Sequence, residues 1–329
     1  MDKYRLFGAE TSPYSMKVRS FLRYKKVEFD WVARNSATEP EFNVHAQVPT
    51  VPLLVSPENV SSQDSSAILA RLDLAHPQPP AQPEDPGLAG LSLLFEDYAD
   101  EWVNKIMFHY RWTNSPDREN AAERVLEQLL AGRKAKDKAA ALQKVIDSMT
   151  GRLPLVGAGG DNGKALEASF QRLITLLDAH LKEHLCLFGG HPCFADFALA
   201  AQLGQMLSDP TPGERIRDEA PFVAAWCEFM DAPTAGAPWA SLEDLKPTLL
   251  PLLKDEFAVA YMPWAKSNAE GTARRRKLTS VDLKDGKFEQ TTQRYAGTSF
   301  KAIRKEITKS KPKNALKGIF AASGVSEYL

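Results

Sequence analysis

The first quarter of the chain alternates between strand-like and helix-like patterns. Short apolar runs at 4–8 and 27–32 predict two strands, and apolar positions within 13–26 recur at the i, i+3, i+4 spacing of an amphipathic helix. After a polar turn, residues 50–62 hold two short apolar runs around a Pro/Asn turn, which predicts a hairpin. Residues 64–75 predict a second helix. This order is typical of a small α/β domain.

A proline-rich stretch separates the α/β unit from a long helical region. Five prolines interrupt this stretch, so neither a helix nor an inner strand can run through it. Beyond it, apolar residues recur at helical spacing. The pattern predicts an α/β domain at 1–75, a linker at 76–88, an all-helical domain at 89–258 and a C-terminal extension at 259–329.

The C-terminal extension is basic and has fold signals of its own. Asp285-Gly286 stands between two alternating runs, a strong hairpin signal, and a helix follows. With 14 Lys and Arg against 5 Asp and Glu, residues 271–329 carry a formal charge of +9, and residues 1–270 carry −10. Such a segment either contacts nucleic acid or anionic lipid, or folds against the acidic body. Because aromatic and aliphatic residues are interspersed with the basic ones, we expect it to pack on the main body, beside the helical domain.

The composition is that of an ordinary globular protein, with 43% hydrophobic and 25% charged residues. Its three cysteines, Cys186, Cys193 and Cys227, show no paired spacing, which argues against a disulfide framework or a zinc site and favours a reducing compartment. The first ten residues lack the apolar run of a signal peptide, and no stretch approaches the roughly 20 apolar residues that cross a bilayer. We therefore expect a cytoplasmic protein.

The turn between the first strand and the first helix carries Ser-Pro-Tyr-Ser at 12–15, where redox proteins of the thioredoxin type carry Cys-Pro-Tyr-Cys. The N–H groups that open a helix favour a bound anion such as a thiolate, and the hydroxyl of Ser12 can add a hydrogen bond. Both effects lower the pKa of a thiol. The alternative is that Ser12 is an ordinary helix cap. Thiol–disulfide exchange is excluded at this turn, since no cysteine occurs in the first 185 residues.

Two further segments of the α/β domain are candidates for ligand binding. Pro52 stands where a strand should begin, a position that tolerates the missing N–H, and a cis bond before it would be the special case. Asp64 and Ser65 open a helix, where free amides and a carboxylate form a nest suited to the α-amino-acid end of a ligand. The alternative for Asp64 and Ser65 is again ordinary capping.

Four segments, in this order along the chain, resemble the glutathione transferase superfamily over residues 1–258. They are SPYSMKVR, TVPLL, QDSSAI and GGHPCFADFAL. They are similar, respectively, to the serine type of active-site turn, the cis-proline segment, the segment that holds the γ-glutamyl group and the helix-start box of the second domain. The resemblance is closest to longer members that carry a C-terminal extension. It implies an α/β plus all-α fold, with a thioredoxin-like N-terminal domain, the superfamily's helical domain and a small C-terminal extension.

The resemblance also implies roles for residues of the first domain. Ser12 would be the catalytic hydroxyl that faces the glutathione sulfur. Val51 would bind the cysteinyl backbone with Pro52 in cis, and Asp64 and Ser65 would hold the γ-glutamyl group. The other residues expected on the glutathione side are Pro13, Tyr14 and Ser15.

Three positions compete with this pattern or depart from it. Tyr4 is a rival for Ser12, since some classes use an N-terminal tyrosine, but it lies two residues before the place of that tyrosine. Cys193 stands three residues before Asp196, where Ser or Thr normally caps the helix, and a thiol is a poor cap acceptor. Thr50 stands where many members have a residue that contacts glutathione, so that contact is not expected by the resemblance.

The long helix after the linker would form the wall of a second-substrate pocket. Asp97, Glu101, Asn104 and Phe108 recur at helical spacing, and a cleft lined by Asp, Glu, His and Arg111 side chains could do acid–base work. The residues that we expect in the pocket are Glu101, Asn104, Phe108 and Arg111. The alternative is a solvated face in which Glu101 pairs with Lys105 at i, i+4. No residues stand at metal-ligand spacing, and the serine turn has no partners in a hydrolase motif.

The resemblance implies an enzyme that takes glutathione as co-substrate, and we expect no metal. It would activate glutathione as a thiolate for attack on a small electrophile, by conjugation, reductive cleavage or isomerisation. The resemblance implies a homodimer, and we expect neither nucleic acid nor a membrane as partner. The alternative is a non-catalytic binding or scaffold protein that keeps the fold for association, since fold alone does not imply catalysis.

Overall fold

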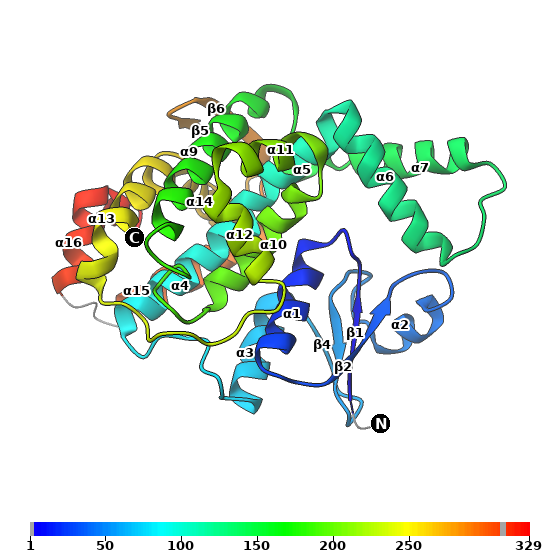
Figure 1. Ribbon diagram of the computed structural model, residues 1–329. Coiled ribbons are helices and arrows are strands. Elements are labelled where there is room, and N and C mark those ends of the chain that lie inside the picture. The colour runs from blue at the N-terminus through cyan, green and yellow to red at the C-terminus, as the bar shows by residue number, and fades with distance from the viewer. Residues whose placement is uncertain (1–2, 310–313) are drawn as a thin grey trace.

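The computed structural model describes residues 3–309 and 314–329. Residues 1–2 and 310–313, which belong to the predicted first domain and extension, lie outside the described residues. A small sheet with its helices forms one end of the molecule, and a larger group of helices forms the other (Figure 1). The predicted class, an α/β domain followed by a helical domain, is confirmed.

The first domain is a four-stranded sheet with three helices. Its elements are β1 (Tyr4–Gly8), α1 (Pro13–Tyr24), β2 (Phe29–Ala33), α2 (Glu39–His45), β3 (Leu53–Val55), β4 (Ser61–Gln63) and α3 (Ser65–Ala75). The strand order is β2-β1-β3-β4, in which only the β1–β2 pair is parallel. Side chains alternate along β1, so Leu6 joins the main core while Phe7 packs on Phe42 of α2 at the opposite face. The prediction of a polar turn between β2 and β3 was wrong for the residues of α2.

The helical region begins with one long helix that changes its winding midway. Helix α4 (Pro86–Asp97), the π segment η1 (Tyr98–Val103) and α5 (Asn104–Thr113) follow one another without a gap. A π turn holds an extra residue and is frequent at functional sites. The other elements of this region are α6 (Ser115–Leu130), α7 (Lys138–Thr150), α8 (Leu153–Val156), η2 (Gly160–Asn162), α9 (Gly163–Leu181), α10 (Phe194–Leu207), α11 (Pro210–Glu219), α12 (Pro221–Phe229), α13 (Leu242–Leu252), η3 (Leu253–Tyr261) and α14 (Met262–Ala273).

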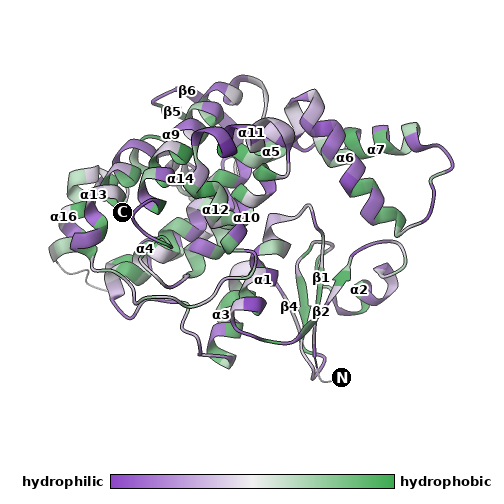
Figure 2. Ribbon diagram, in the orientation of Figure 1, coloured by the Kyte–Doolittle hydropathy of each residue, from purple (hydrophilic) through white to green (hydrophobic). Residues whose placement is uncertain are grey.

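Helices α6 and α7 form a hairpin that lies above α2 in the view of Figure 1. Hydrophilic and hydrophobic residues alternate along both helices (Figure 2), which is typical of helices that bury one face. Val125 of α6 and both Leu142 and Ile146 of α7 pack against the main core. The hairpin is therefore an amphipathic addition to the helical domain, placed next to the sheet.

The two domains share one hydrophobic core. Helix α1 packs along α10, and the ring of Phe21 lies edge-to-face on Phe194 and Phe197 at centroid distances of 5.6 and 5.0 Å. Such pairs contribute about 0.5–1.5 kcal/mol beyond the area they bury. The first helix of the sheet domain is therefore fixed relative to the helical domain.

The start of α10 is held by Asp196. Its carboxylate accepts hydrogen bonds from the backbone N–H groups of Cys193 and Leu187 at 2.9 and 2.8 Å. The Cys193 thiol donates to the same carboxylate at 3.1 Å. The thiol therefore contributes to this cap as a donor, although it is a poor acceptor.

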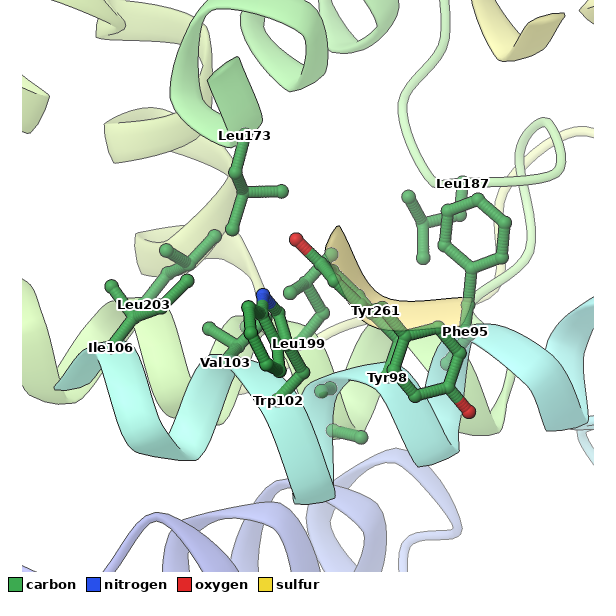
Figure 3. Close-up of a cluster of buried hydrophobic side chains, with 14 of the residues drawn as sticks. Phe95, Tyr98, Trp102, Val103, Ile106, Leu173, Leu187, Leu199, Leu203 and Tyr261 are labelled. Carbon is green, nitrogen blue, oxygen red and sulfur yellow. The ribbon is translucent and has the colours of Figure 1, made fainter. Parts of the chain in front are cut away.

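Two π segments meet inside the helical domain. The ring of Tyr98 in η1 lies 4.3 Å from that of Phe257 in η3 and 5.4 Å from that of Tyr261. The Tyr261 hydroxyl donates to Asp97 at 2.6 Å. Figure 3 shows Tyr98, Trp102 and Tyr261 within this cluster of buried side chains. The long helix is thus held at η1 by residues that come late in the chain.

The C-terminal extension packs on the main body, as predicted. Its further elements are β5 (Leu278–Leu283), β6 (Gly286–Thr291), α15 (Arg294–Lys309), α16 (Asn314–Ser323) and η4 (Val325–Glu327). The predicted hairpin at Asp285-Gly286 joins β5 to β6. Helix α15 lies against α4 and α14. Phe288 packs on Trp102 at 5.2 Å, and Phe300 packs edge-to-face on Tyr261 at 6.1 Å. The extension therefore completes the core around η1.

Candidate functional site

Three loops of the first domain meet at one end of the sheet. Phe7 of β1 pairs with Leu53 of β3, and Leu53 pairs with Gln63 of β4. The residues just after β1, just before β3 and just after β4 therefore lie side by side. These segments are 9–12, 51–52 and 64–65. The sheet thus brings together the serine turn, the proline segment and the Asp-Ser segment that the sequence analysis selected separately.

Ser12 is the N-cap of α1, and Pro13 follows it in the first turn. The Ser12 hydroxyl oxygen accepts a hydrogen bond from the Ser15 N–H at 3.3 Å, so the capping function is present. Because a hydroxyl has a donor as well as its acceptor sites, Ser12 can donate to a ligand at the same time. The Ser15 hydroxyl accepts from the Ala9 N–H at 3.2 Å and fixes the loop behind the turn. Tyr4, the rival to Ser12, lies at the opposite end of β1.

The peptide bond between Val51 and Pro52 is cis, as the sequence analysis expected for this segment. The backbone before it is held by Gln63, which the sequence analysis missed. The Gln63 amide nitrogen donates to the carbonyls of Val48 and Thr50 at 2.9 and 2.8 Å, and its oxygen accepts from the Val48 N–H at 3.0 Å. The peptide groups of Val51 are thereby presented in a fixed position at the end of the sheet.

Asp64 is the N-cap of α3 and has a φ of +75°, which is uncommon for a residue with a side chain. Its Oδ1 accepts hydrogen bonds from the N–H groups of Ser66 and Ala67 at 3.0 and 3.3 Å. Its Oδ2 accepts from the hydroxyl of Tyr295, in the C-terminal extension, at 2.5 Å. The carboxylate is therefore fixed at the start of α3, beside Ser65, and capping is again one of its functions.

A buried lysine joins three elements behind these loops. The Lys17 ammonium donates to Ser66 Oγ at 3.0 Å, Glu96 Oε1 at 2.7 Å and Asp100 Oδ2 at 2.7 Å. Burial lowers the pKa of Lys17, but the two carboxylates outweigh it and hold the pKa above its usual value. The sequence analysis missed Lys17. The sequence does contain a sign that Lys17 is buried. Lys17 lies four residues before Phe21, and therefore on the same apolar face of the helix.

Acidic residues line the long helix where it passes the first domain. Burial is the main cause that raises the pKa of both Asp97 and Asp100 to about 6, and that of Glu101 to about 8. The Tyr14 hydroxyl donates to the backbone carbonyl of Asp100 at 2.8 Å. Tyr14 therefore ties the serine turn to η1, beside carboxyl groups whose pKa is raised by burial.

One of the four residues assigned to a second-substrate pocket belongs elsewhere. The Arg111 guanidinium is buried and donates to Asp209 Oδ2 at 2.7 Å, to the carbonyl of Thr11 at 2.9 Å and to the carbonyl and side-chain oxygens of Gln205, each at 2.9 Å. Assigning Arg111 to the pocket was therefore wrong, because protein acceptors occupy its guanidinium. Its contact with Thr11 instead holds the serine turn against the helical domain.

The other three residues of that assignment differ in their exposure. Phe108 is buried and packs on Trp112, while Glu101 and Asn104 are half-buried. The alternative prediction was that Glu101 pairs with Lys105, but Lys105 makes other contacts. Its ammonium donates to the carbonyl of Val156 at 3.2 Å and lies over the Trp264 ring.

A cavity of about 550 Å³ lies between the first domain and α6. Among its lining residues are Ala9, Thr11, Arg34, Val51, Val125 and Leu129. Gln128 joins α6 to the first domain at the edge of this cavity. Its side chain accepts a hydrogen bond from the Glu10 N–H at 2.9 Å and donates one to the Arg34 carbonyl at 3.0 Å. This volume is in the range of small-molecule sites. The sequence analysis selected no residue of α6. Val125 and Leu129 line the cavity because α6 packs against the first domain, and a local sequence pattern does not reveal such a contact.

Other chemistry has little support among the described residues. Burial raises the pKa of the thiols of Cys186, Cys193 and Cys227, which makes them poor nucleophiles. Within residues 3–309 and 314–329, no group of three or more His, Cys, Asp or Glu side chains is placed to hold a metal ion. Over the same residues, no helix combines the length and apolar character needed to cross a membrane.

Comparison with known proteins gives two matches to domain families. Residues 6–80 match the family described as "Glutathione S-transferase, N-terminal domain", and residues 138–229 match "Glutathione S-transferase, C-terminal domain". A glutathione S-transferase of wheat (Triticum aestivum) is 36% identical over 88 residues, which are 27% of this chain and 41% of the wheat protein. The chain thus matches about two fifths of the length of this relative.

Solved structures of similar proteins include two bacterial glutathione S-transferases. One, from Methylobacterium radiotolerans, was solved in complex with glutathione sulfonate; it is 23% identical, the match covers 73% of this chain and 99% of that chain, and the TM-score is 0.44. Another, from Rhodospirillum rubrum, is 18% identical, with coverages of 75% and 91% and a TM-score of 0.48. The two family matches take in just over half of the sequence, in the order that the four motifs predict. The chain belongs to the glutathione transferase superfamily.

Proposed function

We propose that the protein is a glutathione transferase, which binds glutathione as co-substrate and presents its thiolate to a small electrophile. The observation that carries the proposal is the meeting of the Ser12 cap, the cis Val51–Pro52 peptide and the Asp64-Ser65 helix start at one end of the sheet. Family membership supports it. The cavity beside Val51 offers a place for the electrophile.

In this proposal each segment has a separate task. Asp64 and Ser65 hold the γ-glutamyl end, and the Val51 backbone pairs with the cysteinyl backbone. The sulfur then lies at the start of α1, where the helix N–H groups and the Ser12 hydroxyl stabilise the thiolate. The thiol proton passes to solvent, and a sulfur lone pair forms the bond to the electrophilic carbon. In a substitution, the leaving group departs with its bonding electrons.

Binding and turnover test the proposal in two steps. We expect glutathione to bind the full chain in calorimetry, and an electrophile panel that includes a generic aryl halide to be consumed faster with the protein than without it. Binding without turnover of any member would support the non-catalytic scaffold instead. Absence of binding would contradict both the transferase and a glutathione-binding scaffold.

Replacing the hydroxyl at the turn should act on the thiolate. In Ser12→Ala, we expect the pKa of bound glutathione to rise by about one to two units, because a hydrogen bond to a charged acceptor contributes roughly 1.5–3 kcal/mol. Ultraviolet titration of the bound thiolate measures this pKa. Ser115→Ala is the matched control, since Ser115 also precedes a proline at a helix start. An unchanged pKa in Ser12→Ala would assign the effect to the helix N–H groups.

Removing the carboxylate of Asp64 should act on affinity. In Asp64→Ala, we expect KM for glutathione to rise about tenfold with kcat little changed, because an ion pair with the ligand's ammonium stabilises the ground and transition states alike. Asp137→Ala is the control for the loss of a helix cap, since the Asp137 carboxylate caps α7 by accepting a hydrogen bond from the Ala140 N–H. A normal KM in Asp64→Ala would remove this residue from the site.

We also propose a homodimer in a reducing, cytoplasmic compartment. The dimer rests on family membership, and the compartment is supported by three cysteines that are all free thiols in the structure. Light scattering of the purified chain tests the dimer. A monomer at micromolar concentration would contradict it.

A further inference from the structure

The C-terminal extension reaches the proposed glutathione site through one side chain. Tyr295 is the second residue of α15, and its hydroxyl donates to Asp64 Oδ2 at 2.5 Å across 231 positions of sequence. The Tyr295 residue is 61% exposed, so the contact lies at the open side of α3. Its partner is the carboxylate that caps α3 and that we assign to the γ-glutamyl end of glutathione.

The base of Tyr295 is fixed by the main body. Phe300, one and a half turns further along α15, is 1% exposed and packs on Tyr261. Just before the helix, the Gln293 N–H donates to Asn268 Oδ1 at 2.9 Å, and the Gln293 side chain donates to the carbonyl of Leu155 at 2.9 Å. The hydroxyl of Tyr295 therefore reaches Asp64 from a helix that is fixed to the main body.

The carboxylate of Asp64 has capacity left for a ligand. Its Oδ1 already accepts two helix N–H groups, whereas its Oδ2 accepts only the Tyr295 hydroxyl in the described structure. A carboxylate offers about four acceptor positions, so one position at Oδ2 remains. Burial is the main cause that raises the pKa of Tyr295, and the carboxyl groups of Asp64, Glu101 and Asp100 raise it further. The surroundings of Oδ2 are thus acidic, and the free acceptor position on Oδ2 is suited to a cationic donor.

We propose that Tyr295 is a positioning residue of the glutathione site, which orients the Asp64 carboxylate toward the α-ammonium of the ligand's γ-glutamyl residue. The extension is then part of the binding site as well as part of the core. This inference rests on the proposed function, since it needs glutathione at the first domain. It assigns Tyr295 no contact with the sulfur and no part in the transfer step.

The test compares two ligands on the full chain. Glutathione and its analogue glutaryl-cysteinyl-glycine differ only in the α-amino group that Asp64 would bind. In Tyr295→Phe, we expect roughly five- to tenfold weaker binding of glutathione, because one hydrogen bond to a charged acceptor is lost at a partly exposed position. We expect less than a twofold change for the analogue, an unchanged thermal midpoint and an unchanged kcat. In the Asp64→Ala background, Tyr295→Phe should have no further effect.

Tyr328→Phe is the matched control, since Tyr328 also lies in the extension and its ring lies against the ammonium of Lys266. It should leave binding of both ligands unchanged. If wild type binds glutathione and Tyr295→Phe binds it equally well, the inference is overturned and the proposed function stands. Equal weakening of both ligands together with a lower thermal midpoint would make Tyr295 a structural residue and also overturn the inference. A wild-type chain that does not bind glutathione overturns both.

Discussion

A chain that ends after Ala258 should not hold the native fold. The missing segment contributes large side chains to the main core, and burial of each stabilises the fold by about 1.5–3 kcal/mol. These side chains are Tyr261, Trp264, Phe288, Phe300 and Ile307. Their combined loss is on the order of 10 kcal/mol, which matches the whole stability of a typical protein. We expect loss of the cooperative thermal transition in circular dichroism and strong binding of a hydrophobic dye.

If the shortened chain is insoluble, a point variant can still test whether the extension stabilises the fold. Phe288→Ala removes a fully buried ring from its contact with Trp102 and should cost about 3–5 kcal/mol in urea unfolding. Phe222→Ala is the control, since Phe222 is 43% exposed. A shortened chain that melts like the full one and stays monodisperse would mean that the extension is a free arm, and the nucleic-acid or lipid interpretation of its charge would return.

Lys17→Met should be the most damaging single substitution near the site. The Lys17 side chain is 1% exposed, and its ammonium is bonded to the carboxylates of Glu96 and Asp100. Methionine fills a similar volume but leaves two acidic groups buried without their cation. Breaking a buried pair in this way costs about 3–5 kcal/mol. Urea unfolding at pH 8 measures the loss, and Lys144→Met, an exposed lysine on α7, is the control.

The loss in Lys17→Met should depend on pH. Burial already raises the pKa of Asp100 to about 6, and Lys17 opposes this rise. Without the ammonium the pKa rises further, so the carboxyl group protonates more readily in the folded chain. Protonation removes the buried charge, and the deficit of the variant should therefore be full at pH 8 and smaller at pH 5.5. An equal deficit at both values, or no deficit at all, would contradict this account of Lys17.

The sequence predicts the parts of the site that depend on local backbone chemistry. The helix start at Ser12-Pro13, the strand start at Pro52 and the helix start at Asp64 each follow from what a cap or a proline can do in its own segment. These three positions lie together because β1, β3 and β4 pair in one register. Their meeting followed from the resemblance rather than from any single pattern, and the chemistry assigned to them remains our proposal.

Features that depend on distant neighbours were not predictable in this way. Helix α2 has one fully buried residue, Phe42, so its segment has no helical period to detect. Arg111 lies at the same helical spacing as the residues expected in the pocket. Its side chain is nevertheless held by Asp209 and Gln205, which are about 100 positions away in the sequence. The insertion of a π segment also shifts the faces of the long helix after Tyr98, which simple i, i+4 counting does not anticipate.

The contact between Asp64 and Tyr295 also bears on the order in which the protein is made. The ribosome releases the first domain, with every motif of the superfamily's first half, long before residue 295 has been synthesised. A nascent chain at that stage has the sheet available but lacks both the α10 surface on which α1 packs and the hydroxyl that reaches Asp64. Pairings between such remote segments form late and slow folding. A message truncated near its end would therefore yield a protein that carries the family's motifs and yet lacks the hydroxyl bound to Asp64.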